Sequence, residues 1–247
     1  MTTQLHLAAQ YLAAAGISFV DKKDDDSHTN LGFSIEQGSL YTRKLKGQSI
    51  VLSLNYDLFI LEWNDQGKKN VLKLDGTSHA EVLDWIQKMA KTSNIGPYTY
   101  DLHYELPYKI QDDYIFKLED LNGLQKLKEQ RILTSNILRE FLSINRLNSE
   151  IRIWPHHFDS GAFAPLEDES GLAVGLGLAI PDTMIQDYYF YISAYQGHNG
   201  IDTSSFSPLT NGVWKNDGFK GAVLPITGID FSKGVQFFNE AFNAYKN

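Results

Sequence analysis

The stretch "VLKLDGTSHAEVLDWIQKMA", Val71 to Ala90, aligns without a gap with "VLPITGIDFSKGVQFFNEAF", Val223 to Phe242. Each copy predicts a short strand, then a turn at a glycine, Gly76 or Gly228, and then a helix. A repeated pattern at this separation indicates two halves with one plan. The alignment rests on pattern more than on identity, so the duplication is a hypothesis.

The helix of each copy has a recognisable start. Ser78 and Glu81 have the spacing of a capping box, and Asp230 is the expected N-cap of the second helix. Apolar residues then recur at helical spacing and predict one buried face on each helix. These residues are Val82, Trp85, Ile86 and Met89 in the first copy and Val235, Phe238 and Phe242 in the second.

Upstream segments extend the pattern. Two apolar or alternating runs precede each copy, "QSIVLSL" and "DLFILEW" in the first half and "GLAVGLGLAI" and "DYYFYISAY" in the second. Helices are expected at about residues 4–15, ended by Gly16, and 121–145, and a match of Gly38 to Gly161 aligns one further strand. The sequence therefore predicts an α+β fold of tandem α-β-β-β-β-α halves, with mostly antiparallel sheets and helices packed on one face.

Prolines mark the expected boundary between the halves. The segment "GPYTYDLHYELPYKIQDD" is bracketed by Pro97 and Pro107. We predict a first, degenerate half at 1–96, a linker strand at 97–117 and a second half at 118–247 that carries the site. The second half is longer because of a polar loop from Gln196 to Gly218, and long irregular loops in compact domains are usually functional or disordered.

Composition excludes several classes of protein. The 247 residues have a formal net charge of −8 and no cysteine. Without a basic surface the chain is not expected to bind nucleic acid, and without thiols it has no disulfide or cysteine-ligated metal. No apolar run approaches the roughly 20 residues of a membrane span. We expect a cytoplasmic protein with a possible small-molecule ligand and a possible homo-oligomeric state; whether it uses a cofactor is unknown from the sequence.

Familiar signatures of nucleotide binding and hydrolysis are absent. The sequence has no G-x-x-x-x-G-K-[ST], G-x-S-x-G or H-E-x-x-H. The run "GLGLAI", Gly175 to Ile180, is not a dinucleotide fingerprint, because its third glycine is missing and Pro181-Asp182 predicts a turn where a helix should begin. Its glycines are expected to let a backbone or a bulky ring approach the strand.

The run "IWPHHFDSGAF" holds the candidate catalytic pair. In an extended segment His157 and Asp159 lie on one side and His156 and Phe158 on the other. Such an imidazole–carboxylate pair orients the ring and raises its basicity, as in general bases and in the support of metal ligands. The alternative is structural: Asp159 caps the following turn, and the histidines bond to neighbouring carbonyls.

Further candidates come from the rest of the second half. In "DYYFYISAY" the alternation places Tyr189, Tyr191, Ser193 and Tyr195 on one face, which suits either a pocket for a polar ligand or a packing surface. His198 in "QGHNG" could close over a site. In "GVWKNDG", Trp214 is either a cap on the core or a stacking platform for a ligand. The predicted ligand-binding set is Trp154, His156, Tyr191, His198, Trp214 and Asp217.

The segment "YDLHYEL" offers a second cluster. On a strand, Asp101, His103 and Glu105 would share one face and Tyr100 and Tyr104 the other. A metal could use such a trio, but this pattern is far more typical of a half-buried strand that shows its polar side to water. Metal binding is therefore left open.

The order "IWPHHFDSGAF", "GLAVGLGLAI", "DYYFYISAY" and "NGVWKNDGFKGAVLP" resembles an uncharacterised bacterial family with a W-P-H-H-F-D motif. The resemblance covers most of the chain and implies a shared fold and a shared site around Trp154, His156, His157, Asp159 and the Trp214 loop. It brings no activity with it.

Three functions are compatible with these residues. The favoured one is binding of a small polar or sugar-like ligand in the second half. The alternatives are a metal- or histidine-dependent hydrolase or lyase that uses His157 and Asp159, and an assembly protein whose aromatic strand forms an interface. An interface predicts a flat, exposed tyrosine face, whereas a ligand site or an enzyme predicts a concave one.

Overall fold

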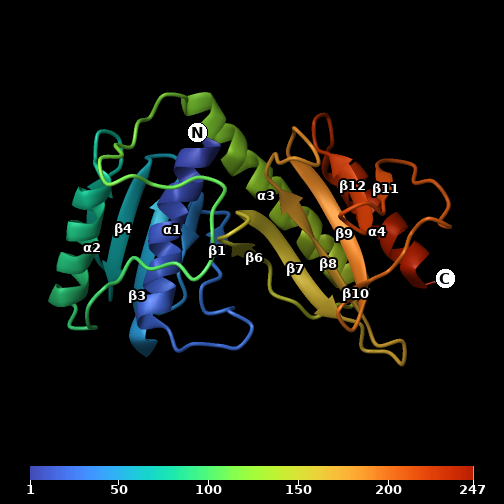
Figure 1. Cartoon of the computed structure of the whole chain (residues 1–247), viewed down its shortest axis with the longest axis horizontal. Coiled ribbons are helices and arrows are strands. Elements are labelled where there is room, and N and C mark those ends of the chain that lie inside the picture. The colour runs from blue at the N-terminus through green and yellow to red at the C-terminus, as the bar shows by residue number, and fades with distance from the viewer. Residues whose placement is uncertain (247) are drawn as a thin grey trace. The chain divides into compact units, whose positions relative to one another are not determined.

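The computed structural model describes residues 1–246 and divides them into two compact units (Figure 1). The first unit comprises Met1–Gln130 and Ile153–Phe158. The second comprises Arg131–Arg152 and the chain from Asp159 onward. The boundaries expected at residues 96 and 117 remain a prediction.

The main elements of the first unit are a helix, a sheet and a second helix, in that order along the chain. Its five strands form an antiparallel sheet in the order β1-β2-β3-β4-β5. The elements are α1 (Thr2–Phe19), β1 (Gly32–Ser34), β2 (Ser39–Tyr41), the 3-10 helix η1 (Leu45–Gly47), β3 (Ile50–Asn55), β4 (Ile60–Asp65), β5 (Lys68–Lys73) and α2 (His79–Thr92).

The second sheet has seven strands in the order β11-β12-β9-β8-β7-β6, with β10 beside β9. The elements are α3 (Leu121–Ile144), which begins in the first unit, β6 (Arg152–Trp154), β7 (Asp159–Pro165), β8 (Leu172–Ala179), β9 (Tyr189–Gln196), β10 (Asn199–Gly200), β11 (Val213–Lys215), β12 (Gly221–Pro225) and α4 (Phe231–Lys246). The predicted α+β class with mostly antiparallel sheets is confirmed.

The two aligned copies have the same local structure. Gly76 and Gly228 both have positive φ, 80° and 78°, which glycine adopts without a steric penalty. Ser78 and Glu81 form the predicted capping box at α2, and the Asp230 carboxylate accepts a hydrogen bond of 2.9 Å from the Lys233 amide at the start of α4. These likenesses support the proposed duplication.

The turns upstream correct the alignment. Gly38 closes the turn between β1 and β2 with φ 57°, and Phe158 closes the turn between β6 and β7 with φ 58°. By its place in the turn Gly38 matches Phe158 and not Gly161, which lies inside β7. The alignment by glycine position was wrong because the turn between β6 and β7 has a non-glycine residue, Phe158, in the left-handed region.

The helix α1 is longer than predicted. It continues past Gly16 to Phe19, so Gly16 does not end it. A Cβ on Gly16 would lie 2.8 Å from the His28 carbonyl oxygen, closer than carbon and oxygen can approach. The glycine is needed for this close packing between α1 and the segment 21–30.

Residues 96–113, here called the strap, form no strand or helix, which corrects the predicted linker strand. The strap crosses α1 in Figure 1, where it is drawn in green. Its side chains from 101 to 110 alternate between exposed and half-buried, as the sequence pattern predicts. The strap tyrosines pack on α1, however. Because the backbone groups of a helix are already hydrogen-bonded within it, the strap has no partner with which to form the hydrogen bonds of a sheet.

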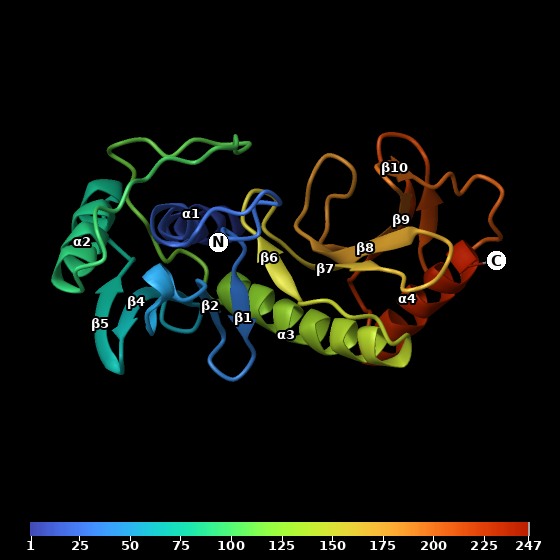
Figure 2. The same ribbon diagram turned by 90° about the horizontal axis from the view of Figure 1, so that it is seen from below.

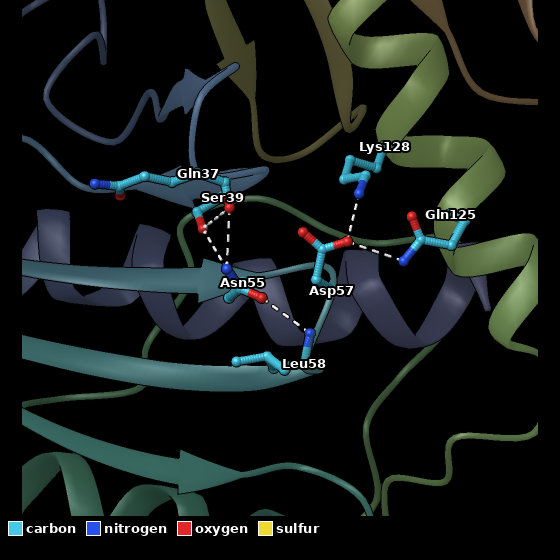
Figure 3. A network of polar contacts seen from close by, with 7 residues as sticks. All are labelled: Gln37, Ser39, Asn55, Asp57, Leu58, Gln125 and Lys128. Carbon is cyan, nitrogen blue, oxygen red and sulfur yellow. Dashed lines mark hydrogen bonds and ion pairs between the residues drawn. The ribbon is translucent and has the colours of Figure 1, made fainter.

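A polar network joins the turn between β3 and β4 to the start of α3 (Figure 3). The Asp57 carboxylate accepts a hydrogen bond of 2.9 Å from Gln125 and pairs with the Lys128 ammonium group. Asn55 donates to the Gln37 carbonyl at 3.0 Å and accepts from the Leu58 amide at 2.9 Å. Both turns at this end of the sheet are thus held by side chains.

The second sheet has two different faces. Phe190 and Ile192 of β9 are buried, and Phe190 packs on Phe238 of α4. Figure 2 shows α3 and α4 on this same side of the strands. The face turned away from the helices, here called the tyrosine face, carries the alternate residues. They are Asp159, Gly161, Phe163, Ala173, Gly175, Gly177, Ala179, Tyr189, Tyr191, Ser193 and Tyr195.

Among the described residues, no helix combines the length and apolar character required to cross a membrane.

Candidate functional site

The W-P-H-H-F segment forms a turn rather than the extended run that we expected. Residues 155–158 fold back so that the Phe158 amide donates to the Trp154 carbonyl at 2.7 Å. As a result, the His156 and His157 rings lie together with centroids 4.2 Å apart. The expected separation of the two histidines onto opposite sides is wrong because Phe158 takes a left-handed conformation.

Two buried polar residues of α1 hold this turn. His6 Nε2 lies 2.7 Å and Gln10 Nε2 2.9 Å from the Pro155 carbonyl oxygen. Because a carbonyl only accepts, His6 bonds through an Nε2 proton, and its Nδ1 faces the Tyr108 hydroxyl. The Phe158 ring stacks on His6 with centroids 4.8 Å apart. The motif is therefore part of the core of the first unit.

Around this turn the first unit gathers four histidines. His156 contacts Tyr104 of the strap with centroids 5.5 Å apart, and the neighbouring His103 stacks against His28 at 6.3 Å. His103 Nε2 also lies 3.4 Å from a carboxylate oxygen of Asp26. We call His28, His103, His156 and His157 the histidine cluster. Three separate chain segments contribute to it.

Burial disfavours charge on two members of the cluster. It lowers the pKa of His28, which is 4% exposed, below the usual value, and the positive charges of His103 and Lys22 act in the same direction. Burial and the charges of His157 and His103 likewise lower the pKa of His156. The Asp26 carboxylate raises both pKa values but does not outweigh these effects. Both rings are therefore neutral at pH 7.

No three of the His, Asp and Glu side chains within residues 1–246 are arranged to hold a metal ion. In particular, Asp101, His103 and Glu105 are exposed side chains of the strap, and His103 is directed to Asp26. The pattern that could have indicated a metal site is the solvent side of the strap.

The two members of the predicted catalytic pair belong to different units. His157 is an exposed residue of the first unit, and Asp159 is a buried residue of the second, 8% exposed. Within the second unit the Asp159 carboxylate accepts a hydrogen bond from the Tyr191 hydroxyl. Burial and the Asp159 charge raise the pKa of Tyr191 well above its usual value, so this phenol stays protonated and donates.

Glycines make this tyrosine–aspartate contact possible. A Cβ on Gly177 would lie 2.9 Å from the Tyr191 hydroxyl oxygen and 2.2 Å from the Ser160 carbonyl oxygen. A Cβ on Gly175 would meet the Tyr195 ring at 3.5 Å and the Phe163 ring at 3.7 Å. The prediction that the glycines of "GLGLAI" admit bulky rings is confirmed.

Trp214 lies on the other face of the sheet. In the register Trp214 pairs with Ala222, and Ala222 pairs with Ile192, so Trp214 shares a face with Ile192 and not with Tyr191. Its ring packs edge-on against Phe206 and Tyr245, with centroids 5.1 and 5.5 Å away. Its Nε1 donates to the Ser207 carbonyl at 2.9 Å. Trp214 and Tyr191 therefore do not line one pocket.

The remaining predicted residues lie at exposed turns or at a strand end. His198 occupies the two-residue turn between β9 and β10, and Asp217 is exposed after β11. Trp154, at the end of β6, is half-buried and belongs to the first unit. The structure thus groups Trp154, His156 and His157 in one unit and Asp159 and Tyr191 in the other.

Sequence reasoning missed two features of the tyrosine face and its surroundings. Phe163, 49% exposed, shares the face with Asp159, and strand alternation from Asp159 could have found it. On the helix side, the buried Arg131 donates to the Ser160 hydroxyl at 2.6 Å. No sequence signal indicated this bond, because the residues lie 29 positions apart on different elements.

Comparison with protein families, curated proteins and solved structures found no match to this chain.

Proposed function

We propose that this protein is a noncatalytic binding protein for a small polar, sugar-like ligand that lies on the tyrosine face of the second unit. The observation that carries the proposal is the arrangement around Gly175. Two aromatic rings and the Ser193 hydroxyl lie within 3.7 Å of the position that a Cβ would occupy there. Because Gly175 has no side chain, the two rings can pack against the strand, and their outer faces can stack on the flat side of a ligand.

The polar groups of this face suit hydroxyl recognition. Ser193 donates to the Tyr195 hydroxyl at 2.9 Å, and that phenol can in turn donate to a ligand. Phe163 and Tyr195 have centroids 6.1 Å apart and planes at 47°, so the two rings contact each other and form one aromatic surface. Aromatic walls with a few placed hydroxyls are typical of sites for small polar ligands.

Burial favours a ligand over an interface as the use of this face. An interface predicts flat, exposed tyrosines, but Tyr189 is 3% exposed, Ser193 is 1% exposed, and Tyr191 and Tyr195 are half-buried. The Tyr191 hydroxyl donates to the Asp159 carboxylate, which supports a structural role for this carboxylate over the catalytic alternative. The bacterial family resemblance and the cytoplasmic location stay predictions beside this proposal.

The test is a titration of the full chain with a panel of monosaccharides and disaccharides, followed by amide chemical shifts in NMR spectra. We expect saturable shifts centred on Phe163, Gly175 and Tyr195. The substitution Phe163→Ala should abolish them, and Phe231→Ala, which removes a ring of similar exposure, 44% against 49%, should not. Shifts absent for every sugar, or equal in both variants, would refute the proposal.

A further inference from the structure

The histidine cluster lies at the weakest attachment of the strap. The N-terminal end of the strap is firmly held: the Tyr98 hydroxyl donates to the Tyr11 carbonyl at 3.2 Å, and Thr99 and Ser18 exchange two hydrogen bonds of 3.0 and 3.1 Å. The middle has no helix or strand. It is held on α1 by two side-chain hydrogen bonds. The Tyr104 hydroxyl donates to Gln10 Oε1 at 2.7 Å, and the Tyr108 hydroxyl is hydrogen-bonded to His6 Nδ1.

The middle of the strap contacts two histidines, the buried His28 and the half-buried His156. His103 stacks on His28 from the segment 21–30, and the adjacent Tyr104 contacts His156 from the turn 155–158. The turn itself is fixed to α1 by His6 and Gln10 through the Pro155 carbonyl. The strap is therefore the part of the cluster with the fewest backbone constraints.

The charged groups around the cluster determine the effect of protonating its histidines. Asp25, Asp26, Lys22 and His103 act on His28, and His157, His103 and Asp26 act on His156. Asp26 can neutralise one imidazolium, and it already lies 3.4 Å from His103. When all four imidazoles are charged, positive groups exceed the nearby carboxylates and repel one another across the strap.

We propose that the histidine cluster is an acid-sensitive latch, which keeps the middle of the strap on α1 at neutral pH and releases it when the cluster is protonated. Release uncovers the polar side chains His6 and Gln10 of α1, which are 1% and 0% exposed in the closed form. The latch is independent of the ligand site proposed above, since all its residues belong to the first unit.

The direction of the effect follows from the histidine environment. A buried histidine with a lowered pKa stays neutral in the closed form but takes up a proton more readily once the strap leaves. The open form therefore binds more protons, and lowering the pH below about 6.5, the ordinary histidine pKa, shifts the equilibrium toward it.

The test is hydroxyl-radical footprinting of the full chain at pH 7.5 and pH 5.5, read by mass spectrometry. We expect the labelling of Tyr104 and Tyr108 to rise several-fold at pH 5.5, because protonation of the cluster favours the open form. Tyr11 and Tyr98, which are 0% and 8% exposed, should stay protected and so report that the unit remains folded. Unchanged labelling of Tyr104 and Tyr108, or an equal rise at Tyr11, would overturn the latch.

Substitutions separate the latch from general acid sensitivity. His156→Gln keeps a neutral polar side chain, and we expect it to reduce the acid-induced labelling of Tyr104 several-fold. His28→Gln should act in the same direction through the other side of the strap. His198→Gln is the control, because this exposed histidine lies in a turn of the second unit. An acid response that survives both cluster substitutions would overturn the latch.

Discussion

The two sheets differ most on the faces that their helices leave uncovered. In the first sheet this face carries Tyr41, Ser53, Glu62 and Val71 in one cross-strand row, with Glu62 paired to Lys69 at 3.0 Å. Tyr41 and Val71 are 37% and 50% exposed. In the second sheet the corresponding row carries Gly161, Gly177 and Tyr191. One face is an ordinary solvated surface, and the other is built from glycines and rings.

The two uncovered faces also have a feature in common. Each sheet places a tyrosine over a glycine, Tyr41 over Gly32 and Tyr191 over Gly177. Only in the second is the tyrosine hydroxyl bonded to a buried carboxylate, Asp159. The helix-covered faces are alike because both must bury apolar side chains, whereas the uncovered faces are free to diverge.

The largest difference in stability between the two faces is expected from substitutions of Gly177 and Gly32. In Gly177→Ala the new methyl group meets backbone atoms of β7, including the Ser160 oxygen at 2.2 Å. We expect a loss of about 3 kcal/mol in the free energy of unfolding by urea, at the upper end for overpacking. In Gly32→Ala the methyl group meets only the exposed Tyr41 ring, which can rotate away, so the loss should be below about 1 kcal/mol.

Equal losses in the two glycine variants would mean that the tyrosine face is no more constrained than the solvated one.

A smaller difference in stability is expected when the hydroxyl groups of Tyr191 and Tyr41 are removed. Tyr191→Phe removes a donor from the buried Asp159 carboxylate, and a hydrogen bond to a charged group is worth about 1.5–3 kcal/mol. Tyr41→Phe removes an exposed hydroxyl and should change stability by less than about 0.5 kcal/mol. Urea unfolding of both variants gives the comparison. A neutral Tyr191→Phe would show that the contact contributes nothing to folding.

The smallest effect is a difference in acid sensitivity between the units. Burial lowers the pKa of His28, His79 and His156, all in the first unit. Their unfolded forms take up protons first as the pH falls below about 6.5, so this stability is present above that pH and is lost below it. Hydrogen exchange at pH 7.5 and 5.5 should show reduced protection in β3 and β4 and little change in β8 and β9. Parallel losses in both sheets would contradict this expectation.

Much of the fold could be predicted from local patterns. Strand alternation, the glycine turns and the capping residues of α2 and α4 depend on neighbours in sequence, and these predictions hold. The strap failed as a strand because pairing needs a partner edge, which no local pattern reports. Its inward and outward residues were nevertheless assigned correctly, since alternation depends only on an extended backbone.

The candidate site was harder to predict than the fold. Proximity in sequence suggested a pair of His157 with Asp159, but in its own unit Asp159 accepts a hydrogen bond from Tyr191, 32 positions away. His6 and Gln10 gave no signal because polar residues on an otherwise apolar helix are inconspicuous. Their partners outside α1 are a backbone carbonyl and tyrosines more than 90 positions away.

The left-handed Phe158 has a consequence for how the two halves can exchange residues. A bulky side chain in this backbone conformation costs about 1–2 kcal/mol, whereas glycine at the matching position 38 avoids that cost. The chain keeps Phe158 because its ring fills the space over His6. The two substitutions therefore have different effects. Phe158→Gly relaxes the backbone and opens a void. Gly38→Phe adds backbone strain and also meets the Lys128 side chain, which lies 2.7 Å from where a Cβ would stand. The two turns share a shape but are not interchangeable parts.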